Sequence, residues 1–186
     1  MVYWRSSQPG ITRLGSTPQQ EMVRQQRAFT AVGALIVTCA HIERSIAKAI
    51  GDIEKAEACL NNYWPPTYTN VHELRVPELK TRLRELFRAY GTPQEISDLE
   101  ANLSLHAQAH KTRKMLAHHQ MFYPDPNDPD IIETYQLDRT RGVADIRKHS
   151  IEELHALYET ITEVPGDIGM LTLDVFNSIQ KEPKAP

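Results

Sequence analysis

The residues best suited to chemistry are concentrated in one segment, HAQAHKTRKMLAHH, which runs from His106 to His119. No acidic residue occurs in residues 101–123, whereas Lys111, Arg113 and Lys114 together contribute three positive charges. The whole chain carries a net charge of −3, which leaves −6 for the rest of the protein. A concentrated basic segment in an acidic protein is typical of a site for an anion or a phosphate backbone.

Two of these histidines and one arginine share a single helix face. His106, His110 and Arg113 continue the apolar positions Leu99 and Leu103 at alternating intervals of four and three residues. This spacing is that of one face of an α-helix. The face therefore begins apolar and ends in groups that carry charge or protons.

A second stripe with the same spacing lies in the long helix expected near the start of the chain. Its one charged member is Glu43, and the others are Phe29, Val32, Ile36, Cys39, Ile46 and Ile50. Stripes of neighbouring bundle helices face each other, so Glu43 and Arg113 are candidates for a buried ion pair.

The stretch RKMLAH places His118 five residues after Arg113, near the end of its helix. Here the chain resembles the HEPN superfamily, whose mark is an Arg, four to six residues and a His, often as Arg-Asn-x-Leu-Ala-His. The resemblance also includes Glu43 on a long first helix, and it covers roughly residues 29–122. It implies a metal-independent endoribonuclease with Arg113 and His118 as catalytic residues. As an alternative, it implies a non-catalytic relative that binds RNA, nucleotides or a protein partner. Lys114, which stands where the motif often has Asn, favours this alternative.

Cleavage of RNA by its own 2′-hydroxyl needs a proton carrier near neutral pH, and His118 is suited to this role. It also needs a cation against the charge that develops on phosphorus, and Arg113 can grip two phosphate oxygens. The plainer alternative for His118 is a cap that interacts with the helix dipole.

Positions five apart on an ideal helix point about 140° away from each other. Arg113 and His118 therefore converge only if the helix frays at His118 or if two chains pool their residues. Because HEPN-like proteins usually pair, the resemblance implies a homodimer with a shared cleft. Four residues are expected to support this cleft: Glu43, His106, His110 and Lys114.

The same segment supports a metal-binding alternative. His106 and His110 are four residues apart, a recurrent spacing of metal ligands, and Glu43 can supply an oxygen ligand. His41 or His118 would complete the shell. There is no HExxH motif, and the neighbouring arginine would repel a cation. The favoured hypothesis therefore includes neither a metal nor another cofactor.

Start and stop signals predict the elements that position these residues. They predict an all-α, up-and-down bundle of about four main helices with a small β-hairpin inserted before the last helix. The expected elements are a helix from Thr17 to about Gly51, a short helix at 53–63, a helix at 77–90 ended by Gly91, a helix from Thr92 to about His118, a loop QMFYPDPNDPD, a hairpin that turns at 139–142, and a last helix from Ser150 that Pro165–Gly166 interrupts.

Length and composition predict one domain. A chain of 186 residues fits a single HEPN-like helical domain at 16–180, between flexible segments at 1–15 and 181–186. Two cysteines, no signal-peptide pattern and no apolar run of roughly 20 residues favour a cytoplasmic protein that does not span a membrane. The expected partners are a second copy of the chain, with RNA or another protein.

Overall fold

The computed structural model describes residues 17–60, 74–118, 121–124, 128, 130–138 and 143–181. Within these ranges the chain forms five helices and three strands. They are α1 (Pro18–Leu60), α2 (Val76–Tyr90), α3 (Pro93–His118), β1 (Met121–Pro124), β2 (Ile131–Asp138), β3 (Val143–Ser150), α4 (Ile151–Ile161) and α5 (Val164–Lys181). This confirms the predicted all-α bundle with a small β-hairpin inserted before the last helix; in the structure the last helix is divided into α4 and α5. The predicted flexible segment at 1–15, and 182–186 of the predicted tail, lie outside the described residues.

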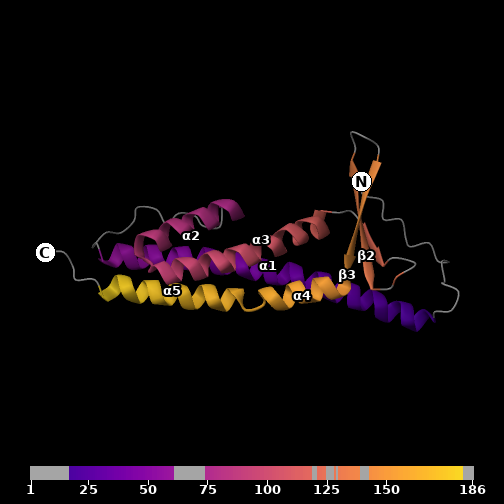
Figure 1. The fold of residues 1–186 in the computed structure, drawn as a ribbon, viewed down its shortest axis with the longest axis horizontal. Helices are drawn as coiled ribbons and strands as arrows, with labels where there is room; N and C mark the ends of the chain where they lie inside the picture. Colours follow the sequence, from indigo (N-terminus) through magenta and orange to yellow (C-terminus); the bar gives the residue numbers. More distant parts are fainter. Residues whose placement is uncertain are drawn as a thin grey trace.

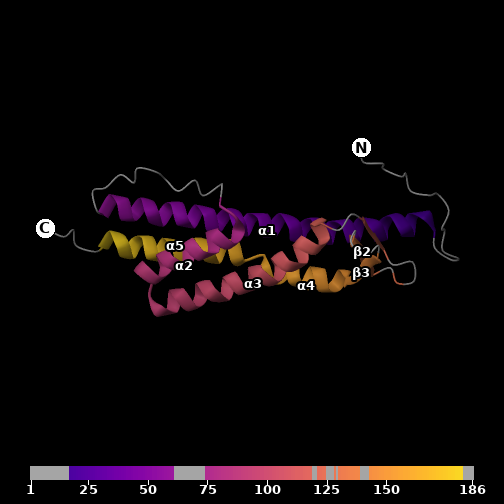
Figure 2. The ribbon, with the colours of Figure 1, turned by 90° about the horizontal axis from the view of Figure 1, so that it is seen from above.

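The long helix α1 organises the bundle. Figure 1 shows α4 and α5 lying along α1, and Figures 1 and 2 show α3 running in the direction opposite to α1, α4 and α5. The core lies where these helices meet. Its largest fully buried side chains include Leu35, Ile42, Ile46, Ile50, Ile53, Leu83, Phe87, Leu99, Leu103 and Leu116.

Three helices begin at the capping boxes that the sequence predicts. In each box a hydroxyl accepts a hydrogen bond from the backbone N–H three residues later, and that later residue's side chain accepts one in return. The pairs are Thr17–Gln20, Thr92–Glu95 and Ser150–Glu153. These local signals fix where α1, α3 and α4 begin.

The predicted end of the first helix at Gly51 is wrong, because α1 continues without interruption to Leu60. A glycine inside a helix costs only about 1 kcal/mol relative to alanine. Ile50 and Ile53, on either side of Gly51, are both completely buried. Burial of this face outweighs the cost of the glycine, so the short helix expected at 53–63 forms the end of α1 as far as Leu60.

The predicted hairpin is present and gains a third strand. β1, β2 and β3 form an antiparallel sheet in that order, with Met121 opposite Tyr135 and Ile131 opposite Ser150. The prediction of a loop at QMFYPDPNDPD is therefore wrong for Met121–Pro124. An edge strand tolerates a proline at its end. The predicted turn at 139–142 lies outside the described residues.

The interruption of the last helix occurs just before the predicted position. α4 ends at Ile161 and α5 begins at Val164, so Pro165 lies in the first turn of α5. A proline is accommodated there because first-turn N–H groups have no partner within the helix.

Among the described helices, α1 alone is long and apolar enough to cross a membrane. Of its most apolar stretch, 39% is buried inside the structure. A core helix of a soluble protein meets the same criterion. The expectation that the chain does not span a membrane therefore stays a prediction.

Candidate functional site

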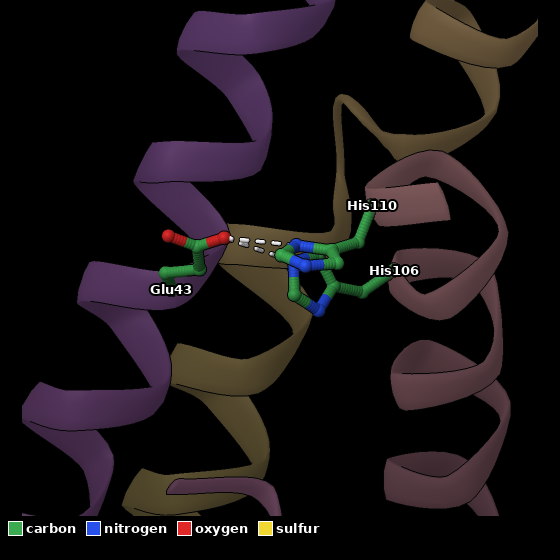
Figure 3. A group of neighbouring side chains, drawn as sticks. All are labelled: Glu43, His106 and His110. Carbon is green, nitrogen blue, oxygen red and sulfur yellow. Dashed lines mark hydrogen bonds and ion pairs between the residues drawn. The ribbon is translucent and has the colours of Figure 1, made fainter. Parts of the chain in front are cut away.

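The candidate site lies between the middle of α1 and the second half of α3. Glu43 projects from α1, and His106 and His110 project toward it from α3 (Figure 3). Glu43 lies next to Ile42, which is completely buried, and its own side chain is 19% exposed. The carboxylate therefore lies at the edge of the core, on the side of α1 that faces α3.

One oxygen of this carboxylate is the centre of the cluster. Glu43 Oε1 lies 2.9 Å from Arg113 Nη1 and 3.1 Å from His110 Nδ1. The ion pair between Glu43 and Arg113 that the facing stripes predict is therefore present. Both side chains are partly buried, so water screens this pair less than a surface pair.

His106 is the deepest member of the cluster. Its side chain has no exposed surface, and neither ring nitrogen has a hydrogen-bond partner within the described part of the chain. Burial, followed by the nearby charge of Lys80, lowers the pKa of His106 to about 3. The ring is therefore neutral at physiological pH. Its Nε2 lies 3.9 Å from Glu43 Oε1, which is too far for a hydrogen bond, and the neutral ring has no charge with which to form an ion pair.

His110 connects the cluster with solvent. Its side chain is 31% exposed and helps line a groove of about 640 Å³ between α2 and α3. A carboxylate only accepts hydrogen bonds, so Nδ1 of His110 carries the proton that it shares with Glu43. Nε2 is then the basic nitrogen of the ring. A carboxylate that fixes the tautomer in this way prepares a histidine to accept a proton.

Two basic side chains and one acidic side chain line the groove beside His110. Lys80 and Arg84 of α2 line it, together with Glu100 of α3. Glu100 is already engaged by Arg84, through contacts of 2.7 and 2.9 Å, and this contact lowers the pKa of Glu100. Burial is the main cause that lowers the pKa of Lys80. These two basic residues, four apart on α2, were not among the sequence predictions.

Of the predicted catalytic pair, the structure describes the side chain of Arg113 but not that of His118. Arg113 lies within the cluster, whereas α3 stays helical to its last residue, His118, whose side chain lies outside the described residues. Two positions five apart on a continuous helix point about 140° apart and differ by about 7.5 Å along the axis. One regular helix therefore does not bring the two side chains together.

Of the residues expected to support the cleft, some lie in the cluster and one lies at the surface. His106 and His110 share the cluster with Glu43, while Lys114 is exposed. The sequence prediction assigns His110 only a supporting role, although it stands three residues before Arg113 on the same face. This spacing was the signal that it would share the same carboxylate.

The residues of the metal-binding alternative also come together. One ligand atom from each of Glu43, His106 and His110 lies within 4.8 Å of the other two. His41 is exposed, and the described candidate metal cluster does not include it. Two imidazoles and a carboxylate are a ligand set that suits Zn²⁺.

Comparisons of the chain with protein-family models, with curated proteins and with solved structures find no match. Membership of the HEPN superfamily therefore stays a prediction from the sequence motif.

Proposed function

We propose that the protein is a metal-independent endoribonuclease of the HEPN type that acts as a homodimer. The observation that carries this proposal is the double contact of Glu43 Oε1, at 3.1 Å from His110 and 2.9 Å from Arg113. A histidine that can accept a proton and a permanent cation are thereby held side by side. These are the two groups that RNA cleavage by its 2′-hydroxyl needs.

In the proposed reaction His110 is the general base. Its Nε2 takes the proton of the ribose 2′-hydroxyl as the 2′-oxygen attacks phosphorus. Arg113 stabilises the additional negative charge on the phosphoryl oxygens. The bond from phosphorus to the 5′-oxygen then breaks, and this oxygen takes a proton. The products are a 2′,3′-cyclic phosphate and a 5′-hydroxyl.

The proton for the leaving oxygen comes from a second histidine, and we assign it to His118 of the partner subunit. Within one chain, the regular helix directs Arg113 and His118 about 140° apart. A two-fold axis beside α3 would place the end of one α3 near the cluster of the other chain. Each dimer would then contain two composite sites.

The charge of the surroundings supports RNA as the substrate. Lys80 and Arg84 line the groove next to His110, and Lys111 and Lys114 are exposed on α3. Basic groups along a groove bind a phosphate backbone without reading its sequence. We therefore expect cleavage with little sequence preference and with strong dependence on salt.

The experiment compares cleavage of a mixed-sequence RNA in excess EDTA by the wild type and by His110→Ala, Arg113→Ala and His118→Ala. Loss of a general acid or base lowers the rate about a hundredfold or more, and loss of the arginine has a comparable effect. His155→Ala is the matched control, because His155 lies on α4 outside the cluster. Circular dichroism establishes that each variant is folded.

Mixing two inactive variants tests the composite site. A heterodimer of His110→Ala and His118→Ala contains one site without either histidine and one complete site. Random exchange of subunits then restores about a quarter of the wild-type rate. A mixture that stays inactive contradicts a shared site, and wild-type protein that binds RNA without cutting it supports the non-catalytic alternative.

A further inference from the structure

We propose that Glu43, His106 and His110 form a binding site for Zn²⁺ or a similar transition-metal dication, and that Arg113 competes with the ion for Glu43. This site goes beyond the proposed nuclease, whose chemistry needs no metal. Three side chains from two helices converge on one point (Figure 3).

The observation that points to a ligand is the state of His106. Its ring is completely buried, both nitrogens lack a hydrogen-bond partner among the described residues, and Nε2 points toward Glu43. An unpartnered buried polar group destabilises the folded protein. Binding an ion at Nε2 would supply the partner that this nitrogen lacks.

The distances are close to those of a zinc site. Zinc binds imidazole nitrogen and carboxylate oxygen at about 2.0–2.2 Å, so tetrahedral ligand atoms lie about 3.3–3.5 Å apart. Glu43 Oε1 lies 3.1 Å from His110 Nδ1 and 3.9 Å from His106 Nε2. All three ligand atoms lie within 4.8 Å of one another, so they would have to move closer together to bind one ion. Histidines four residues apart on one helix are also a recurrent ligand pair.

The guanidinium of Arg113, 2.9 Å from Glu43 Oε1, would have to leave before an ion could bind. The side chain of Arg113 is 28% exposed, which gives it a route toward solvent. Its Nε is buried and has no hydrogen-bond partner in the described part of the chain, so its present position is incompletely satisfied. Ion and arginine therefore exclude each other, and removing the arginine should strengthen metal binding.

A consequence for activity rests on the proposed function. An ion on Nδ1 of His110 forces the remaining ring proton onto Nε2. That nitrogen then has no lone pair to accept the proton of a 2′-hydroxyl. Metal binding would therefore switch off the nuclease by taking its general base.

The test is a titration of EDTA-stripped, full-length protein with Zn²⁺ in competition with a chromogenic chelator. Co²⁺ serves as a second probe, because its visible absorption reports coordination geometry. We expect one ion per chain in the wild type and at least about a hundredfold weaker binding in His106→Leu. Arg113→Gln should bind about tenfold more tightly. His155→Leu, outside the cluster, should bind as the wild type does.

Two results would overturn the site. One is a folded wild type that binds neither ion. The other is binding that His106→Leu leaves unchanged, which would assign the ion to other histidines. Because no RNA enters this titration and the cleavage assay is run in EDTA, failure of the metal site is distinguishable from failure of the nuclease.

Discussion

The buried, neutral state of His106 can be tested by measuring how the free energy of unfolding changes as the pH is lowered. The side chain is completely buried, and its pKa in the folded protein is about 3, against an ordinary value of 6.5. Because the folded pKa is the lower one, the neutral ring contributes its full stability above about pH 6.5 and loses it as the pH falls toward 3. In that window the unfolded chain binds one more proton, so the free energy of unfolding falls by about 1.4 kcal/mol per pH unit. From about pH 6 to about pH 4 the loss amounts to roughly 2–3 kcal/mol.

The assay is urea unfolding followed by circular dichroism in EDTA, for the wild type and His106→Leu at several pH values. Titrating groups far from His106 change both proteins alike, so the difference between the two curves reports on His106 together with its charged neighbours Lys80, His110 and Arg113. Leucine has a similar volume and removes two unpartnered nitrogens, so the variant should be as stable at neutral pH or more stable by about 1–3 kcal/mol. The gap should widen in favour of the variant as the pH falls. Parallel curves for the two proteins would refute a buried, neutral His106.

Two further predictions concern glycines and thiols. A Cβ at Gly91 would lie 2.7 Å from the backbone oxygen of Phe87, so Gly91→Ala should destabilise the protein by about 1–3 kcal/mol in urea unfolding. A Cβ at Gly51 meets nothing within 4 Å, and Gly51→Ala should stabilise α1 by up to about 1 kcal/mol; equal effects at both positions would contradict this account. Burial raises the pKa of Cys39 to about 11, whereas Cys59 is exposed. A thiol reagent at mildly alkaline pH should therefore modify Cys59 quickly and Cys39 only on unfolding, and Cys59→Ser should abolish the fast reaction.

Signals in the sequence were sufficient to predict where three helices begin and to predict one contact between residues far apart in the chain. Thr92 and Glu95 form their capping box within four residues, so no tertiary context is needed to predict it. The contact between Glu43 and Arg113 followed from the single charged residue on one stripe and the arginine on another. Two charges on facing apolar surfaces stabilise each other, which makes their pairing predictable.

The exact core face of α1 was not predictable from the stripe alone. The seven positions from Phe29 to Ile50 repeat every seven residues, but a straight helix drifts by about 20° per heptad from such a repeat. Phe29 is accordingly 57% exposed, while Ile50 at the other end is completely buried. Leu35 and Ile42, which the stripe omits, are fully buried. The groove lined by Lys80 of α2 also depends on how two helices cross, which no spacing within one helix specifies.

The cluster buries His106 without a hydrogen-bond partner for either ring nitrogen among the described residues, which destabilises the fold. This energetic cost is the strongest argument that the cluster has a role beyond stabilising the bundle. A structural ion pair needs only Glu43 and Arg113, and a leucine at position 106 would fill the core without unpartnered nitrogens. The chain instead places a completely buried histidine, His106, behind the pair and a partly exposed one, His110, beside it. Departures from good packing chemistry are expected where a site performs chemistry. Glu43 Oε1 contacts both Arg113 and His110, and the proposed metal ion would use the same oxygen, so the proposed nuclease and the proposed metal site would exclude each other at Glu43.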